Sequence, residues 1–323
     1  MPPGMAPTPV APVQGTRAEL LRRFVQAYWL RPENALWMTL RSEILSDTPL
    51  EHPSIDLACG DGVFSFLHCG GIFDPTFDVF TSIAEFDRAG DEHADMFDCV
   101  TDDYQPVIVS PSLDTIDVGT DIKRNMLAKA RLLNLYGRLV EHDNNRPLLF
   151  DDDSFQTVYC NAAYWVANVD RFLTEMARIT RPDGRVILQV KLDGMRRYTL
   201  GAHRGILGDR LLDIIDRGRS ASWPTIADQA TWEARFAASG LRVNAMRPFI
   251  TRTHAHIWDI GLRPIAPLLA KMAQALAPKT RAAIKRQWVD LFCELLEPLC
   301  DPDVDLFAAK NEPAEVQYVL RPA

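Results

Sequence analysis

Strand-like and helix-like segments alternate between residues 54 and 192, and this alternation constrains the fold more than any other feature of the sequence. Apolar runs of strand length occur at 54–58, 115–122, 138–143, 154–162 and 185–192. Apolar residues at helical spacing fill 123–136 and 169–180. The pattern predicts an α/β, doubly wound and mostly parallel sheet with helices on both faces. Ligands of such sheets bind beyond the carboxyl ends of the strands.

The remaining segments extend this core into one domain over 15–323. We expect two helices within 15–50, an acidic and aromatic insertion at 71–112, and a substrate or cap region at 193–323 with the last strands at 240–250 and 314–320. The cap contains proline-bounded helices over 264–299, which fit a lid, a homodimer interface or a peripheral membrane contact. Residues 1–14 are rich in proline and small residues, which predicts a disordered tail.

Charge and cysteine content narrow the class of partner. The formal net charge is -8 and no Lys/Arg-rich block is present, so we expect a small partner and no nucleic acid. The six cysteines form no CxxC pair, which indicates reduced thiols and no structural metal. The sequence shows no secretion signal and no long apolar run, so we expect a cytoplasmic protein.

The stretch "DLACGDG" (56–62) places Gly60 and Gly62 between the first predicted strand and its helix. A glycine-rich turn of this kind lets a nucleotide-like ligand approach the backbone, and the following helix offers amide donors. Dinucleotide-binding turns need a third glycine, where this chain has Ser65. The dinucleotide fingerprint is therefore incomplete.

Taken in order, four segments resemble class I S-adenosylmethionine-dependent methyltransferases with a methyltransferase type 11-like core. They are "DLACGDG", "VGTDIKRNMLAKAR", "EHDNNRPLLFDDDSFQTVYC" and "ARITRPDGRVILQV". The resemblance covers about residues 54–192 and implies a Rossmann-like seven-stranded sheet. Ala58 departs from the family pattern by replacing its first glycine. The separation of Gly62 from Asp121 is also unusually long, and it requires the insertion to leave the sheet undisturbed.

The resemblance implies a set of cofactor-binding residues for S-adenosylmethionine. Asp121 would accept hydrogen bonds from both ribose hydroxyls, because one carboxylate can take two donors; its alternative role is a helix N-cap. Ile122 would pack on the adenine, Asp143 and Asn144 would face its edge, and Asn161 would face the methionine end. The residues implied to line the methionine part are Asp56, Ala58, Gly60 and Gly62.

The sequence defines the acceptor site less closely than the cofactor site. We expect it around the carboxyl edge of the sheet, built by the N-terminal helices, the segment 196–223 and the C-terminal helices. Its aromatic candidates are Tyr28, Trp29, Trp37, Tyr164 and Trp165. The candidates for a general base are His203, His254 and His256, because imidazole titrates near neutral pH. The acids at 151–153 are interpreted as a polar turn, and no metal site is expected.

These observations predict a methyltransferase that acts on a small-molecule or lipid-linked acceptor in a biosynthetic pathway, at oxygen or at carbon. Two alternatives remain at this point. An NAD-dependent oxidoreductase would share the strand, the turn and the acid, but Ser65 disfavours it. A non-catalytic protein retaining the fold would not need Asp121.

Overall fold

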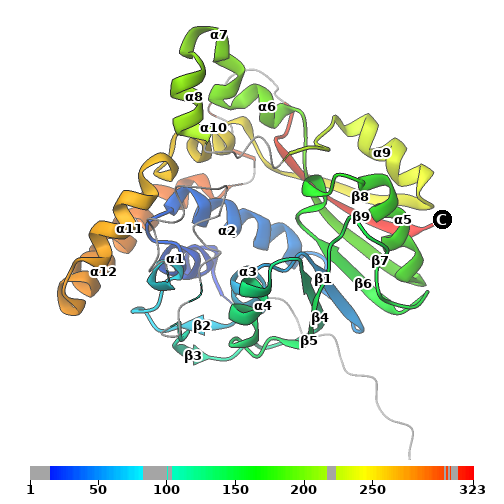
Figure 1. The fold of residues 1–323 in the computed structure, drawn as a ribbon, viewed down its shortest axis with the longest axis horizontal. Helices are drawn as coiled ribbons and strands as arrows, with labels where there is room; N and C mark the ends of the chain where they lie inside the picture. Colours follow the sequence, from blue (N-terminus) through cyan, green and yellow to red (C-terminus); the bar gives the residue numbers. More distant parts are fainter. Residues whose placement is uncertain are drawn as a thin grey trace, which may run out of the picture.

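The computed structural model describes residues 15–82, 100, 104–216, 223–301, 303–304, 306 and 312–323, so the predicted tail and the middle of the insertion lie outside the described residues. The main sheet has seven strands and lies in the right half of the view in Figure 1. Its strands are β1 (Ser54–Leu57), β4 (Ile116–Asp121), β5 (Tyr136–Glu141), β6 (Phe155–Cys160), β7 (Thr180–Lys191), β8 (Leu241–Ile250) and β9 (Glu315–Pro322).

The strand order is β5-β4-β1-β6-β7-β9-β8, and only β9 runs antiparallel to its neighbours. This confirms the predicted mostly parallel, Rossmann-like fold. The order reverses at β1, which pairs with β4 on one side and β6 on the other. A ligand crevice is expected beyond the carboxyl ends of strands at such a reversal.

Residues 181–184, which were predicted as a turn before a strand, lie within β7. Thr180 already pairs with Phe155, and regular pairing resumes where Arg185 meets Thr157. The four residues between them are therefore an interruption in one long strand. The prediction of a turn at Arg181-Pro182-Asp183-Gly184 before the strand was therefore wrong, because pairing with β6 on both sides of these residues includes them in β7.

Helices cover both faces of the sheet. On one face lie α2 (Pro32–Ser46) and α3 (Val63–His68), since Gln189 and Gln317 donate from the strands to carbonyls of α2 and the ring of Phe64 stacks on Tyr159. On the other face lie α9 (Gln229–Ala238), whose Phe236 contacts Tyr318, and α5 (Val169–Ile179) beside it.

Two further helices precede or flank the core. The first, α1 (Arg17–Ala27), begins with a capping box between Thr16 and Glu19, which satisfies backbone donors at its start. The second, α4 (Arg124–Arg131), is shorter than the predicted 123–136. Asn134 adopts a left-handed conformation at φ 51°, and the chain enters β5 at Tyr136.

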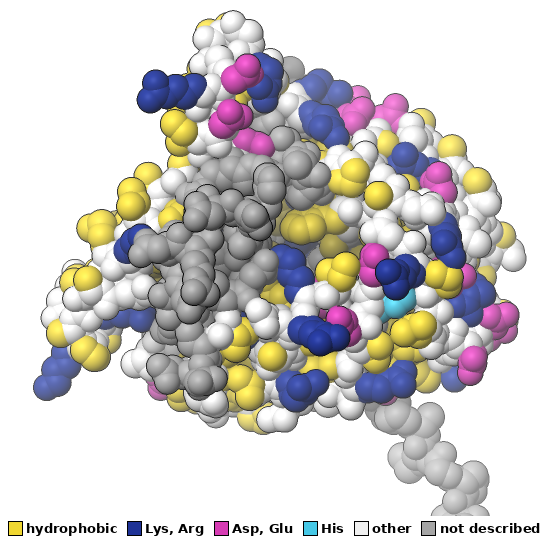
Figure 2. Space-filling view, viewed as in Figure 1, with side chains coloured by type: hydrophobic (Ala, Val, Ile, Leu, Met, Phe, Trp, Pro, Cys, Tyr) yellow, Lys and Arg dark blue, Asp and Glu magenta, His cyan; other side chains and the backbone are white. Residues whose placement is uncertain are grey.

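The cap region consists of α6 (Gly194–Tyr198), α7 (Arg204–Leu207), α8 (Asp209–Asp216), α10 (Arg252–Ile260), α11 (Ala266–Gln274) and α12 (Pro278–Leu296). Figure 2 shows hydrophobic side chains along the edge formed by α11 and α12. The exposed ones on these two helices are Leu268, Met272, Ile284, Leu291 and Leu295. Among the described residues, no helix has the length and apolarity needed to cross a membrane.

The two described ends of the insertion fold back on the core. Strands β2 (Ile72–Phe73) and β3 (Ile108–Ser110) pair with each other in a separate antiparallel sheet. The fully buried Asp78 accepts two hydrogen bonds from Arg281 of α12, at 2.9 and 3.0 Å. This described end of the insertion is thereby bound to the cap. Its strands β2 and β3 do not join the seven-stranded sheet.

Candidate active site

The turn after β1 is held in a conformation that favours glycine. Ala58, Gly60 and Gly62 have φ values of 62°, 61° and 75°, all in the left-handed region. A side chain there costs about 1–2 kcal/mol per residue, so the two glycines are explained and Ala58 carries some strain. A Cβ on Gly62 would also lie 3.1 Å from the Tyr136 ring and 3.2 Å from Ala130. The backbone turn is thus specified by its sequence.

Asp121 lies at the carboxyl end of β4, next to this turn. Its Oδ2 accepts the backbone N–H of Gly60 at 3.0 Å, and its Oδ1 accepts that of Lys123 at 2.8 Å. The cap residue of α4 is Lys123, so Asp121 is not the N-cap of that helix. Although 61 positions separate Asp121 from Gly60, the insertion does not displace the acid.

Three features around Asp121 fit a nucleoside. A Cβ on Gly60 would meet no atom within 4 Å, so the turn leaves room for a ligand on this side. Ile122 is 57% exposed and offers an apolar surface that a base could cover. Among the described residues, buried Asn144 Oδ1 and His142 Nε2 have no hydrogen-bond partner, and an adenine edge offers both a donor and acceptors. The residues present therefore fit S-adenosylmethionine.

Asp143 accepts hydrogen bonds from a residue of its own turn. Its Oδ1 accepts the backbone N–H of Asn145 at 2.9 Å and the Asn145 side chain at 3.0 Å. The Asn145 backbone N–H lowers the pKa of Asp143, so the carboxylate stays ionised. The edge of an adenine ring could hydrogen-bond here to the remaining lone pairs of Asp143 or to Asn144.

Asp56 is buried within β1 below the turn. Its Oδ2 accepts the hydroxyls of Ser65 at 2.7 Å and Tyr136 at 2.8 Å. Burial raises the pKa of Asp56 to about 6, against the lowering effect of these two hydrogen bonds. Ser65, at the position of the missing third glycine, therefore binds the buried carboxyl group of Asp56.

The raised pKa of Asp56 makes stability depend on pH. Because the folded pKa of about 6 exceeds the ordinary 3.8, folding favours the protonated acid. This contribution is present below pH 4 and is lost as pH rises towards 6. We expect Asp56→Asn to flatten the dependence of the free energy of unfolding on pH between 4 and 6, measured by urea denaturation. An unchanged slope would show that Asp56 is not the titrating group.

A polar network runs inward from the carboxyl end of β6. Asn161 Nδ2 donates to the Tyr159 hydroxyl at 3.2 Å, and that hydroxyl donates to Gln189 Oε1 at 3.0 Å. Tyr164 and Trp165 follow in a short 3-10 helix, Ala163–Trp165, with Tyr164 buried and Trp165 half exposed. Asn161 is thus oriented by the strands beneath it.

A buried ionic cluster lies at the carboxyl end of β7 and was missed by the sequence analysis. Glu315 pairs with Arg41 through Oε1, and its Oε2 accepts Lys191 Nζ and Trp37 Nε1, both at 2.8 Å. Burial alone would raise the pKa of Glu315, but the charges of Arg41 and Lys191 outweigh it and hold that pKa below its usual value. Trp37, predicted for the acceptor site, is a member of this cluster.

Aromatic rings surround the ammonium of Lys191. Its Nζ lies 4.1 Å from the centre of the Trp37 ring, 5.1 Å from Tyr164 and 5.5 Å from Trp258. Charged side chains in a strand that otherwise reads as apolar are the signal that could have revealed this cluster, because such groups are rarely buried without partners.

Two other residues predicted for the acceptor site, Trp29 and Tyr28, are buried in the core. Trp29 is buried in the contact between α1 and α12, where its ring meets Trp288 edge-on at 5.9 Å. Tyr28 is buried at the end of α1, and burial raises the pKa of its hydroxyl well above the usual value. Both residues therefore act in packing the N-terminal helices.

The three candidate bases differ in their surroundings. His254 is buried, and its ring nitrogens contact the backbone N–H of Thr251 and the carbonyl of Leu299. These contacts give His254 a capping role, so we do not propose it as a base. His256 accepts a hydrogen bond from Arg252 at 3.2 Å. His203 is exposed in the segment Leu200–His203.

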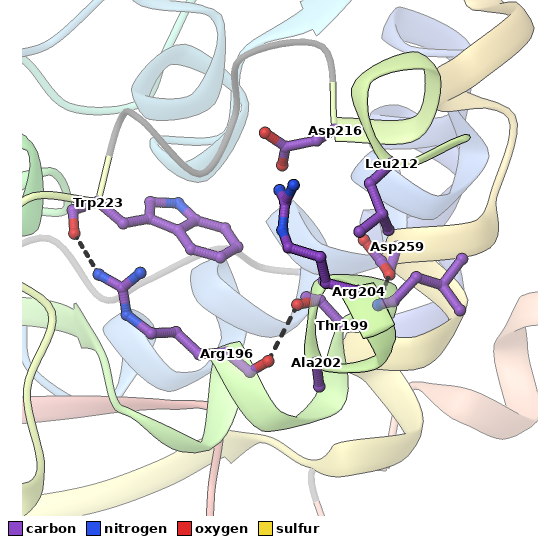
Figure 3. Close-up of a pocket in the computed structure, with 10 residues that line it drawn as sticks. Arg196, Thr199, Ala202, Arg204, Leu212, Asp216, Trp223 and Asp259 are labelled. Carbon is purple, nitrogen blue, oxygen red and sulfur yellow. Dashed lines mark hydrogen bonds between the residues drawn. The ribbon is translucent and has the colours of Figure 1, made fainter. Parts of the chain in front are cut away.

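A cavity of ≈ 280 Å³ opens among the helices that follow β7 (Figure 3). Trp223 forms part of its wall, and Thr225, two residues further on, donates to the carbonyls of Tyr164 and Val166, which follow β6. The cavity therefore lies close to the segments that follow β6 and β7. The residues lining it are Arg196, Thr199, Leu200, Gly201, Ala202, Arg204, Leu212, Asp216, Trp223 and Asp259.

One family model matches part of the chain. Residues 112–188, from just before β4 into β7, match the family model described as a methyltransferase domain. No curated protein matches the chain.

Solved structures with similarity to the chain include a possible histamine N-methyltransferase from Thermotoga maritima, at 11% identity and TM-score 0.45, covering 95% of this chain and 99% of that one. A second is geranyl diphosphate C-methyltransferase from Streptomyces coelicolor, at 11% identity and TM-score 0.43, covering 91% and 84%. A third is a putative methyltransferase in complex with its activator from Haloferax volcanii, at 17% identity and TM-score 0.43, covering 74% and 81%. Similarity at this level says nothing about the acceptor.

Proposed function

We propose that this chain, a class I S-adenosylmethionine-dependent methyltransferase, transfers a methyl group to the oxygen of a small-molecule or lipid-linked acceptor, with carbon as the second choice. The observation that carries the proposal is the position of Asp121 at the glycine turn, 3.0 Å from the backbone nitrogen of Gly60 and beside open space. A carboxylate there suits the two hydroxyls of a ribose.

When bound, S-adenosylmethionine supplies a methyl group on a sulfonium, which is already a good electrophile. The protein then has to orient the acceptor, exclude water and, for a hydroxyl, accept a proton. Asp121 would fix the ribose, Asn144 and Ile122 the adenine, and Asn161 the methionine end. The described residues of 196–216, together with Trp223, would hold the acceptor. His203 is retained as the candidate base, because its neighbours in sequence, Ala202 and Arg204, line the cavity.

A lipid-linked acceptor is supported by the apolar side chains on α11 and α12. Leu268 and Met272 lie four residues apart on α11, and 63% and 66% of their surfaces are exposed. Exposed apolar rows of this kind suit contact with lipid chains. A soluble acceptor would not need them.

Transfer of a labelled methyl group tests the proposal. The protein is incubated with S-adenosyl-[methyl-³H]methionine and matched naphthalene acceptors that carry a hydroxyl, an amine or an activated carbon. We expect label on the hydroxyl compound, with an equal amount of S-adenosylhomocysteine formed. Label on the amine alone would overturn the assignment to oxygen and carbon. Oxidation of NADH without transfer of label would favour the oxidoreductase alternative.

A further inference from the structure

Two buried glutamines of the sheet bind to backbone carbonyls of α2. Gln317 Nε2 donates to the carbonyl of Ile44 at 3.0 Å, and Gln189 Nε2 donates to that of Arg41, also at 3.0 Å. Gln189 Nε2 donates its second hydrogen to Gln317 Oε1 at 2.8 Å. A backbone carbonyl only accepts hydrogen bonds, so the orientation of both side-chain amides is fixed, and Gln189 Oε1 is left as an acceptor.

This orientation determines the direction of the next two hydrogen bonds. Tyr159 donates its one hydroxyl hydrogen to Gln189 Oε1, at 3.0 Å. The hydroxyl oxygen is then an acceptor, so Asn161 turns Nδ2 towards it, at 3.2 Å. Tyr159, Gln189 and Gln317 are each at most 2% exposed, so water does not compete for these groups. The network therefore turns the other polar atom of the amide, Asn161 Oδ1, away from Tyr159.

Asn161 lies beside the glycine turn, on the opposite side of β1 from Asp121. Leu57 of β1 pairs with Thr120 of β4 and with Cys160 of β6. Asp121 and Asn161 are the next residues on these two strands, so they flank the turn that follows Leu57. Asn161 is half-buried, and within the described parts of the chain its Oδ1 accepts no hydrogen bond. A ligand whose ribose is held by Asp121 can therefore extend over β1 towards Asn161.

The methionine part of S-adenosylmethionine ends in an ammonium and a carboxylate. A carbonyl oxygen accepts hydrogen bonds from an ammonium, whereas a carboxylate has none to donate. We infer that Tyr159 is a positioning residue: with Gln189 and Gln317 it holds the carbonyl oxygen of Asn161 towards the crevice, where this oxygen binds the α-ammonium of the cofactor. The inference rests on the proposed function for the identity of the ligand, whereas the orientation of Asn161 is a property of the protein alone.

Two ligands that differ in one group test the inference. S-Adenosylhomocysteine carries the α-ammonium, and 5′-S-(3-carboxypropyl)-5′-thioadenosine keeps the chain and the carboxylate but lacks it. We expect the wild type, titrated calorimetrically, to bind S-adenosylhomocysteine about tenfold or more tightly, because a hydrogen bond from a charged donor contributes at least that factor. Tyr159→Phe should reduce this preference to about threefold or less, since the amide of Asn161 is then free to turn over.

Further variants separate positioning from a general loss of stability. Asn161→Ala should abolish the preference by itself, and adding Tyr159→Phe to it should change the preference no further. Tyr318→Phe is the matched control, because this buried ring contacts Phe236 of α9 on the other face of the sheet, and it should keep the wild-type preference. A wild-type preference in Tyr159→Phe would overturn the inference.

The orientation of Asn161 is tested in the protein without ligand. Its side-chain N–H signals in the NMR spectrum, assigned by their loss in Asn161→Ala, should shift in Tyr159→Phe and stay in place in Tyr318→Phe. Unchanged signals in Tyr159→Phe would overturn the positioning role, whether or not a nucleoside binds. If these signals shift but the wild type does not bind S-adenosylhomocysteine, the proposed function and the assigned ligand fail, and the positioning of Asn161 by Tyr159 stands.

Discussion

Replacing Asp121 by Ala is expected to weaken binding of S-adenosylhomocysteine by roughly 100-fold or more. Hydrogen bonds to a charged group each contribute about 1.5–3 kcal/mol, and the ribose offers two donors to this carboxylate. The variant also loses the acceptor that holds the backbone N–H of Gly60, so the turn itself loosens. The dissociation constant is measured by calorimetric titration.

Asp121→Asn separates these two effects. The amide oxygen can still accept the Gly60 N–H, while the second oxygen and the charge are lost, so we expect binding intermediate between wild type and Asp121→Ala. His203→Ala and His256→Ala serve as controls and should bind S-adenosylhomocysteine within about twofold of wild type. Equal losses in Asp121→Ala and in these controls would show that Asp121 does not hold the nucleoside.

Replacing Glu315 by Ala is expected to lower the free energy of unfolding by about 3–5 kcal/mol. The substitution leaves Arg41 and Lys191 buried without their shared carboxylate, and an uncompensated buried charge carries a penalty of this size. Trp37 Nε1 also loses its acceptor. Urea denaturation followed by circular dichroism measures the change. Glu315→Gln should lose less, because its amide oxygen still accepts a hydrogen bond.

Glu312→Ala is the matched control for this prediction. Glu312 pairs with Arg197 on the surface, where both side chains are more than half exposed, and exposed pairs contribute about 0–1 kcal/mol. A loss below about 1 kcal/mol in Glu315→Ala would mean that the cluster does not stabilise the contact between α2, β7 and β9.

Local sequence patterns predicted the position of the strands, because β1, β4, β6 and the second half of β7 are apolar runs flanked by turn residues. The segment 240–250 was predicted as a strand and is β8, Leu241–Ile250. The helix α10, Arg252–Ile260, was not predicted, since it follows β8 directly and its capping residue Thr251 is preceded by no break in the apolar pattern. The interruption within β7 depends on pairing with β6, which no local pattern contains.

The cofactor side of the site could be predicted from the sequence, and the buried ionic cluster could not. The glycine turn and Asp121 follow strand ends, so topology alone brings them together. The cluster of Lys191 and Glu315 joins residues 124 positions apart, and its third member Arg41 comes from a helix near the start of the chain. A charged residue in an apolar strand indicates that a buried partner exists, but the local sequence does not identify that partner. Only the packing of α2 against the sheet assembles the cluster.

Calorimetric titration of the wild-type protein with S-adenosylhomocysteine, run beside NAD, tests the central claim most directly. We predict saturable binding of one S-adenosylhomocysteine per chain and no heat of binding with NAD. Binding of NAD alone would contradict the methyltransferase assignment. Binding of neither would mean that the turn at Ala58 to Gly62 is only scaffold.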